Sequence, residues 1–184
     1  MHKAEELNLI ERAERGDEAA MRQIYDRHVR TVTAICRRYV VRDDALRDTL
    51  QDVFLAVFQH LPQFRWQGEG SLRAWICRLA VNKSLDTLRQ HTRLEAMDAL
   101  DDVDVADEPM PPMDGVPMEE LMGMIQHLPD GQRTVFNLFV FENLTHREIA
   151  QRLGIREASS ASQYHHARCT LARMVGEYIR IHDL

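Results

Sequence analysis

The segment 95–120 most limits what this chain can fold into. From Glu95 to Glu120 ten residues are Asp or Glu and none is Lys or Arg, and the segment holds four of the chain's six prolines. Proline and repulsion between like charges both oppose compact structure, so the segment is predicted to be a linker. The chain of 184 residues is therefore predicted to form two small domains, residues 1–94 and 121–184.

Leaving out the linker changes the sign of the net charge. The full sequence has a formal net charge of −6, whereas the same count gives +3 for residues 1–94 and +1 for residues 121–184. Both domains are therefore compatible with a polyanionic partner such as DNA. The linker itself has two interpretations: it is a solvated spacer, or its carboxylates occupy a basic channel of a partner.

Several classes of protein are not expected from this sequence. The start of the chain is charged and no apolar run approaches the length that spans a membrane, which predicts a soluble, cytoplasmic protein without membrane insertion. Three widely spaced cysteines without a C-x-x-C pair indicate reduced thiols. Only His165 and Cys169 have the spacing of a ligand pair, and two ligands do not close a structural zinc site, so neither a metal nor a cofactor is predicted.

Enzymatic activity is not expected either, and no catalytic residue is assigned. The chain has only two lysines, Lys3 and Lys83, and neither follows a glycine-rich loop of the kind that holds phosphate. No Ser or Cys stands in the sequence context of a known nucleophile.

Apolar residues recur at helical spacing in both domains, which predicts an all-α fold. Gly16 and Asp17 supply a helix stop followed by an N-cap. The expected core stripe of the following helix comprises Met21, Ile24, Tyr25, His28, Val29 and Val32. A further helix, from Asp43 or Asp44 to Leu61, has the core stripe Leu46, Leu50, Val53, Phe54, Val57, Phe58 and Leu61.

The opposite face of that helix is a candidate protein-docking surface. Asp48, Gln51, Asp52 and Leu55 recur at i, i+3, i+4 and i+7, so they share an outward face. An exposed leucine among carboxylates fits a contact that buries apolar atoms and pairs the acids with basic residues. A solvated helix face with one stray leucine would show the same pattern.

The part of the chain after this helix is a candidate site for single-stranded nucleic acid. A glycine-containing loop carries Phe64 and Trp66, and Ser71 can cap a new helix that has Trp75 near its start. Aromatic rings beside a basic stripe can stack on unpaired bases while arginines hold phosphates. The alternative is that Trp75 belongs partly to the core and the arginines only solvate the surface. The polar stripe on this helix comprises Arg78, Asn82, Asp86, Arg89 and Arg93.

The second domain has the pattern of a helix-turn-helix. Thr145 and Glu148 form a capping box before a short apolar stripe, Gly154 takes the turn, and Arg156 opens the next helix, where it can neutralise phosphate. An ordinary helical hairpin is the alternative. The inward residues of the last helix are expected to be Ser160, Tyr164, Ala167, Leu171 and Met174. The outward residues, which could read base edges by hydrogen bonding, are expected to be Ser159, Ser162, Gln163 and His166.

Both domains resemble one family. The stretches "DTLQDVFLAVFQHLPQF" and "GEGSLRAWICRLAVNKSLDTLR" resemble the second conserved region of extracytoplasmic-function (ECF) sigma factors of the sigma-70 family. The stretches "LPDGQRTVFNLFVFENLTHREIAQRLGI" and "SSASQYHHARCTL" resemble their fourth region. The order, the spacing and the intervening linker match as well, over nearly the whole chain.

The resemblance implies a bacterial, stress-responsive transcription initiation factor that directs core RNA polymerase to promoters. The first domain would dock on the polymerase clamp and open the −10 element, the second would bind the −35 element as duplex, and the linker would run toward the RNA exit region. The implied partners are core RNA polymerase, promoter DNA and an anti-sigma factor. A helix-turn-helix regulator that binds an operator without being a polymerase subunit is the rival function, although it leaves the features of the first domain unexplained.

The resemblance also assigns roles to individual residues. Clamp binding falls on Asp48, Gln51 and Asp52, with Leu55 on the same face. The −10 segment contains Trp75, Arg78, Asn82, Lys83, Asp86 and Arg89. The −35 helix spans Ser159 to His166. The chain departs from the family at the −35 helix, where Ala158, Ala161 and His166 replace a glycine, a basic residue and an arginine, so −35 binding that is weak or unusual in sequence is expected. It also departs where Leu46-Arg47 replaces an acidic stretch, so a docking contact centred on Asp52 and Leu55 is expected.

Overall fold

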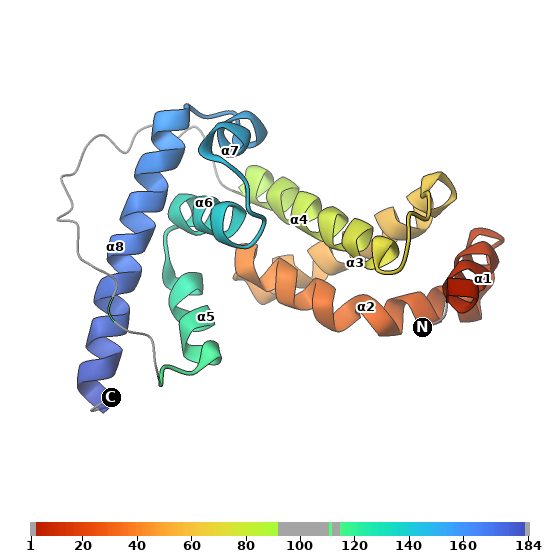
Figure 1. Cartoon of the computed structure of the whole chain (residues 1–184), viewed down its shortest axis with the longest axis horizontal. Coiled ribbons are helices and arrows are strands. Elements are labelled where there is room, and N and C mark those ends of the chain that lie inside the picture. Colours follow the sequence, from red (N-terminus) through yellow and green to blue (C-terminus); the bar gives the residue numbers. More distant parts are fainter. Residues whose placement is uncertain (1–2, 92–110, 112–114, 183–184) are drawn as a thin grey trace. The chain divides into compact units, whose positions relative to one another are not determined.

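The structure, a computed structural model, describes residues 3–91, residue 111 and residues 115–182 (Figure 1). Within these residues every regular element is a helix and no strand occurs, which confirms the predicted all-α fold. The chain divides after Leu88 into two compact units, each with its own core. Most of the predicted linker, residues 95–110 and 112–114, lies outside the described residues.

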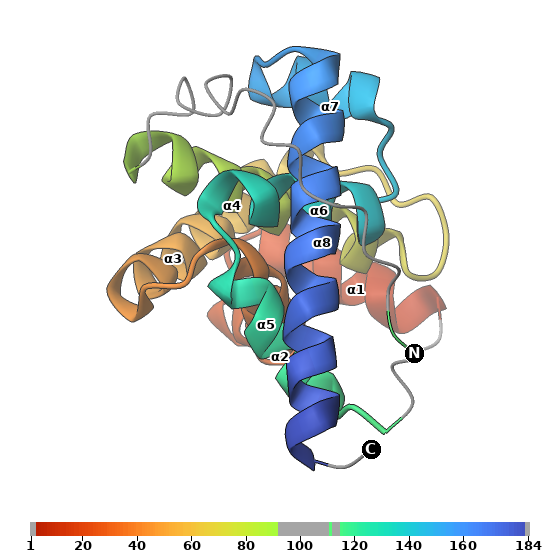
Figure 2. The ribbon, with the colours of Figure 1, turned by 90° about the vertical axis from the view of Figure 1, so that its left-hand side faces the viewer.

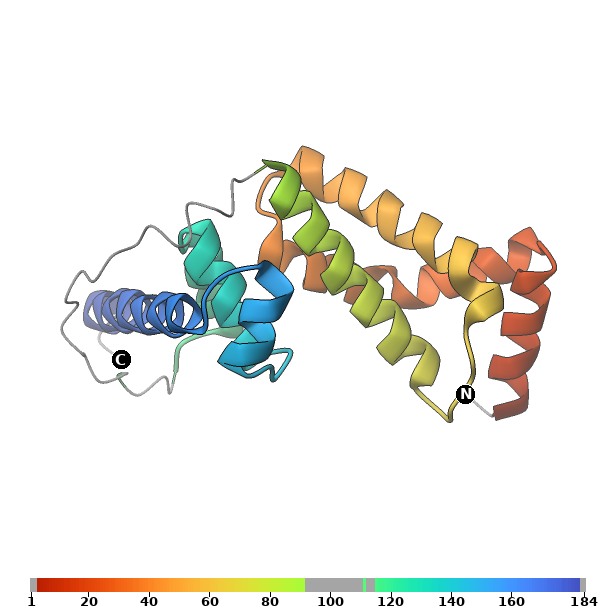
Figure 3. The ribbon, with the colours of Figure 1, turned by 90° about the horizontal axis from the view of Figure 1, so that it is seen from above.

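The first unit contains four α-helices and one 3-10 turn among its described residues. They are α1 (Lys3–Glu14), α2 (Glu18–Tyr39), α3 (Asp43–His60), η1 (Leu61–Gln63) and α4 (Ser71–His91). Gly16 has a positive φ of 84°, and the Asp17 side chain accepts hydrogen bonds from the N–H groups of Ala19 and Ala20. These two residues end α1 and start α2, as the sequence predicts. Figure 3 shows α1 lying across the end of α2, and α1 also contacts η1.

The core of the first unit follows the predicted stripes with one clear exception. Ile24, Val32, Val53 and Val57 are all fully buried. Tyr25, expected in the core, is 40% exposed, so that prediction is wrong. Its ring lies 4.6 Å from that of Phe54, at the edge of the core rather than inside it.

The second unit is built around one long helix. Its elements are α5 (Met118–His127), α6 (Asp130–Val140), α7 (His146–Leu153) and α8 (Glu157–His182). All three shorter helices pack against α8 (Figure 2). Because α5 begins at Met118, Glu119 and Glu120 of the predicted linker lie in its first turn, where the helix dipole favours negative charge.

Local signals in the second unit form as the sequence predicts. Thr145 and Glu148 make both hydrogen bonds of the capping box. The hydroxyl and the backbone N–H of Thr145 both donate to the Glu148 carboxylate, which lowers the pKa of that carboxyl. Gly154 ends α7 in the left-handed region with φ 73°. The buried Arg133 guanidinium donates to the carbonyl oxygens of Gln126 and Leu128 and pairs with Asp130, which ties the α5–α6 turn to α6.

Among the described residues, no helix is both long enough and apolar enough to cross a membrane. Nor do three or more His, Cys, Asp or Glu side chains come together among them in an arrangement that could hold a metal ion.

Candidate nucleic-acid interface

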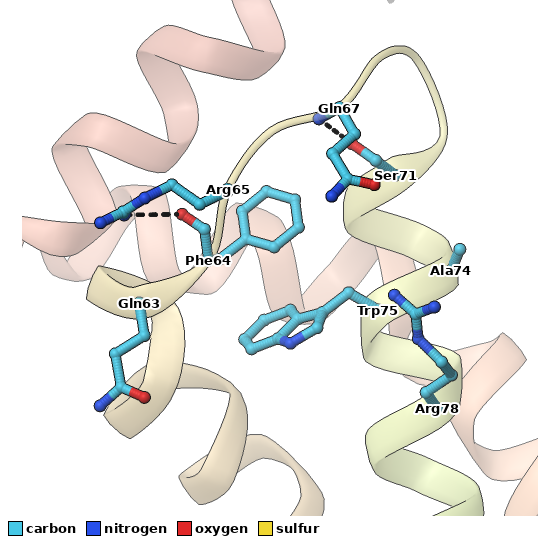
Figure 4. A pocket seen from close by; sticks show the side chains of 8 residues that line it. All are labelled: Gln63, Phe64, Arg65, Gln67, Ser71, Ala74, Trp75 and Arg78. Carbon is cyan, nitrogen blue, oxygen red and sulfur yellow. Dashed lines mark hydrogen bonds between the residues drawn. The ribbon is translucent and has the colours of Figure 1, made fainter.

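A cavity of about 370 Å³ lies between the loop 64–70 and the start of α4. Its volume falls in the range of small-ligand pockets, about 300–1,000 Å³. The walls combine two aromatic rings with hydrogen-bonding groups, which suits a flat polar ligand such as a nucleobase. The lining residues are Gln63, Phe64, Arg65, Gln67, Ser71, Ala74, Trp75 and Arg78 (Figure 4).

Backbone geometry and one serine fix the shape of the loop. Gly68 and Gly70 have positive φ values of 129° and 82°, which residues with side chains adopt rarely. The Ser71 hydroxyl donates to the carbonyl oxygen of Gly68 at 2.7 Å and accepts from the N–H of Gln67 at 3.2 Å. Ser71 is the first residue of α4. Its side chain makes the two hydrogen bonds that close the loop.

The two rings of the pocket lie against each other. The ring centroids of Phe64 and Trp75 are 5.1 Å apart with an interplanar angle of 40°, and Figure 4 shows Arg78 beside Trp75 on the same helix. Trp75 is half-buried, so it contributes to the packing and also presents ring surface to the cavity. The structure thus brings Trp75 and Arg78 into one pocket with Phe64 of the loop.

The polar stripe continues along α4 beyond the pocket. Arg78, Asn82, Asp86 and Arg89 are exposed, as their spacing predicts, and Lys83 is half-buried. Arg93 lies outside the described residues. No sequence pattern indicates Gln63, Arg65 or Gln67 as residues of this site, because only the folded loop shows which of its residues face the cavity.

The predicted docking face lies on α3. Asp48, Gln51, Asp52 and Leu55 are all exposed, and Leu55 is 57% exposed despite its apolar side chain. A groove of about 550 Å³ adjoins this face, and Tyr25 lines it. Its lining is mostly apolar and comprises Tyr25, Arg47, Leu50, Gln51, Phe54, Leu55 and Phe58. The four-residue spacing of Leu50, Phe54 and Phe58 beside Gln51 and Leu55 is the sequence signal that could have indicated it.

The candidate recognition helix α8 departs from the predicted pattern most clearly at Gln163. Arg156 is exposed, and Ser159, Ser162 and His166 are half-buried. Gln163 is only 1% exposed, so the prediction that it projects outward is wrong.

The position of Gln163 on the helix explains its burial. It lies three residues after Ser160 and four before Ala167, both of which are fully buried, so it falls on the core stripe. The inward face is anchored further by a 3.0 Å hydrogen bond between Ser160 Oγ and His146 Nδ1, and by the Tyr164 ring 4.3 Å from Phe139.

Fold and sites together define a helical protein with a pocket-bearing first domain and a helix-turn-helix second domain, and comparison with known proteins identifies both. Residues 24–94 match the family model of sigma-70 region 2, and residues 118–171 match that of sigma-70 region 4.

Relatives along nearly the whole chain agree with this match. The RNA polymerase sigma factor NccH of Alcaligenes xylosoxydans xylosoxydans is 27% identical, over 91% of this chain and 92% of its own length. The ECF RNA polymerase sigma factor SigM of Mycobacterium tuberculosis is 26% identical, over 95% of this chain and 87% of its own. The ECF RNA polymerase sigma-E factor of Escherichia coli K12 is also 26% identical, over 94% of this chain and 95% of its own.

A solved structure, that of CnrH in complex with the cytosolic domain of CnrY, aligns with a TM-score of 0.48 and 22% identity, covering 92% of this chain and 96% of that one. From the two family matches and the relatives, the chain belongs to the ECF group of sigma-70 family RNA polymerase sigma factors, which are promoter-specific transcription initiation factors.

Proposed function

We propose that this sigma factor opens promoters by holding an unpaired base of the −10 element in the pocket between the loop 64–70 and α4. The observation that carries the proposal is the pocket itself, with the rings of Phe64 and Trp75 and the guanidinium of Arg78 around one cavity. Opening a duplex costs stacking and pairing energy, so the protein must bind the separated strand better than the duplex. Stacking of one base on an aromatic ring contributes about 1–3 kcal/mol toward that difference.

The stripe on α4 extends the contact along the strand. Asn82, Lys83, Asp86 and Arg89 follow Arg78 along the helix, and all but the half-buried Lys83 are exposed. Basic groups here would hold phosphates of the separated strand, while Asn82 and Asp86 offer hydrogen bonds to base edges. Pocket and stripe together form a continuous track for single-stranded DNA.

Docking on core RNA polymerase is assigned to the α3 face with its groove. Leu55 and the exposed Tyr25 present apolar surface, and Asp48 and Asp52 present carboxylates on the same side as Gln51. An apolar groove bordered by acids fits a helical partner that carries apolar and basic side chains, and the polymerase clamp is the partner that the family resemblance implies.

Recognition of the −35 duplex is assigned to the start of α8. Arg156 can neutralise a phosphate, and Ser159, Ser162 and His166 remain the candidates for base edges after Gln163 is removed from that set. An anti-sigma factor as a regulatory partner, and passage of the linker toward the RNA exit region, rest on the family resemblance alone.

Promoter opening by one variant of the pocket and one of the α4 stripe tests the proposal. Arg78→Ala and Asn82→Ala are expected to form closed complexes with core polymerase normally but to open the promoter more slowly, measured as permanganate reactivity of −10 thymines over time. Arg30→Ala, an exposed arginine on α2, is the charge-matched control. Loss of closed complexes by Arg78→Ala and Asn82→Ala would assign these residues to docking or folding instead.

A further inference from the structure

The loop that forms the pocket has an anchor outside the pocket, on α1. Trp66 stands between Arg65 and Gln67, two residues that line the cavity. Its indole Nε1–H donates a hydrogen bond of 2.9 Å to Glu6 Oε2, across 60 residues of sequence. The side chain of Trp66 is thus engaged with α1 while both of its neighbours face the pocket.

The acceptor of this bond is an unusual group. Glu6 is only 7% exposed, although it is a carboxylate on a short helix near the start of the chain. Burial of a charged group is unfavourable unless hydrogen bonds compensate it, so the indole N–H is a substantial part of what allows Glu6 to lie here. A charge-assisted bond of this kind also constrains the donor more strongly than a bond between neutral groups.

The helix that carries Glu6 is fixed to the rest of the domain. Leu9, Ile10 and Ala13 of α1 are buried, and α1 contacts both α2 and η1. At its other end, Arg12 pairs with Asp17, the residue that caps α2. The α1 helix is therefore a rigid support rather than a loose extension. It lies outside residues 24–94, the part of the chain that matches the region 2 family model.

We infer that Glu6 is a positioning residue for the base-binding pocket, acting through Trp66 to hold the loop 64–70 in its binding shape. The loop contains two glycines with positive φ, whose backbone freedom makes ordering on binding costly. Ser71 and the Phe64–Trp75 contact fix the loop on its pocket side. The Glu6–Trp66 bond fixes it on the other side, so that the cavity exists before the base arrives.

The inference rests on the proposed function of the pocket, and its test keeps the two apart. The probe is a fluorescent single-stranded oligonucleotide with the −10 sequence, titrated with holoenzyme assembled from core polymerase and the full chain. Glu6→Ala removes the acceptor, Trp66→Phe removes the donor but keeps a ring, and Glu6→Gln keeps an uncharged acceptor. Glu14→Ala, an exposed carboxylate on the same helix, is the control.

Glu6→Ala and Trp66→Phe are each expected to weaken oligonucleotide binding about tenfold, because each removes one hydrogen bond to a charged group. The double variant should lose no more than either single variant, because both remove the same bond. Glu6→Gln should retain most of the affinity. Core-polymerase affinity and closed-complex formation, measured on the same preparations, should match those of the unchanged protein.

Three results would overturn the inference. If Arg78→Ala weakens oligonucleotide binding and Glu6→Ala does not, the pocket binds the strand but Glu6 does not position it. If core-polymerase affinity falls in parallel and Glu6→Gln is equally impaired, Glu6 serves folding. If neither Arg78→Ala nor the Glu6 variants change oligonucleotide binding, the proposed function of the pocket fails together with the inference.

Discussion

The candidate recognition helix separates polar residues that face outward from those that complete the core. Ser160 and Gln163 are buried on the same helix that leaves Ser159 and Ser162 half-buried. Hydrogen-bonding capacity therefore does not distinguish a base-reading residue from a structural one here. Direction does, because successive residues on a helix differ by about 100° and core positions recur every three or four.

Two substitutions on α8 should have different consequences. Gln163→Ala is expected to destabilise the second domain by about 1–3 kcal/mol, because it empties a buried site, and to lower transcription evenly on all promoters. Ser162→Ala should leave stability unchanged and alter preference at one or two −35 positions. Unfolding measurements and transcription from a −35 promoter library compare them. A change of base preference in Gln163→Ala without loss of stability would return it to the DNA interface.

His28 should make the stability of the first domain dependent on pH. Burial lowers the pKa of this imidazole below its ordinary value of 6.5, and the nearby Arg27 and Arg73 lower it further while Glu6 opposes them. In the unfolded chain His28 takes up its proton near pH 6.5, but in the folded domain only at lower pH. The contribution of neutral His28 to the stability of the domain is therefore fully present above pH 6.5. It is lost as the pH falls from 6.5 toward the lower pKa of His28 in the folded domain.

Urea unfolding between pH 7.5 and 5.5 measures this dependence. His28→Gln should flatten the loss of stability toward pH 5.5, whereas His60→Gln, at an exposed position at the end of α3, should leave it unchanged. An unaltered pH profile in His28→Gln would show that other groups carry the effect.

At the scale of helices, the sequence predicts features that depend on neighbouring residues better than contacts between residues far apart in the chain. The Asp17 cap, the Thr145–Glu148 capping box and the Gly154 turn all formed as expected, because each depends on neighbouring residues. The prediction that Tyr25 lies in the core is wrong because helical spacing identifies the buried face of a helix but not where that face ends. The Glu6–Trp66 bond joins residues 60 positions apart and has no local signal. The pocket likewise cannot be predicted without the folded loop, although Phe64 and Trp75 are conspicuous in the sequence.

The α3 face offers a prediction about docking. Asp52→Arg combined with Leu55→Ala should weaken core-polymerase binding at least tenfold, because it reverses one charge and removes the most exposed apolar side chain of the face. The domain should stay folded, since both residues are exposed. Asp26→Arg on α2 is the control for the charge change. Unchanged affinity in a pull-down titration would remove this face from the docking surface.

Over the whole chain, the distribution of charge matters more than its total. The acidic residues of segment 95–120 account for the net charge of −6, and each domain outside it is mildly basic. Few basic groups mean little release of counterions on DNA, so the free protein should bind promoters weakly. A polymerase subunit does not need such affinity, because the polymerase contributes phosphate contacts of its own. The rival operator-binding regulator would need it.

The linker carries a prediction about early transcription. If its charge acts in a basic channel, changing Asp101, Asp102, Asp104, Asp107 and Glu108 to Asn or Gln should alter the ratio of abortive to full-length transcripts. Core-polymerase binding should be unchanged, because the proposed docking face lies on α3. Identical ratios for the changed and unchanged proteins would make the linker a spacer only.

Transcription from two matched templates tests promoter opening most directly. One template has a fully paired −10 element and the other has the same sequence with that element already unpaired, and core polymerase is supplied with either the unchanged protein or Arg78→Ala. Arg78→Ala is expected to lose most activity on the paired template and to recover much of it on the unpaired one. Equal losses on both templates would contradict the claim that the pocket and the α4 stripe open the −10 element.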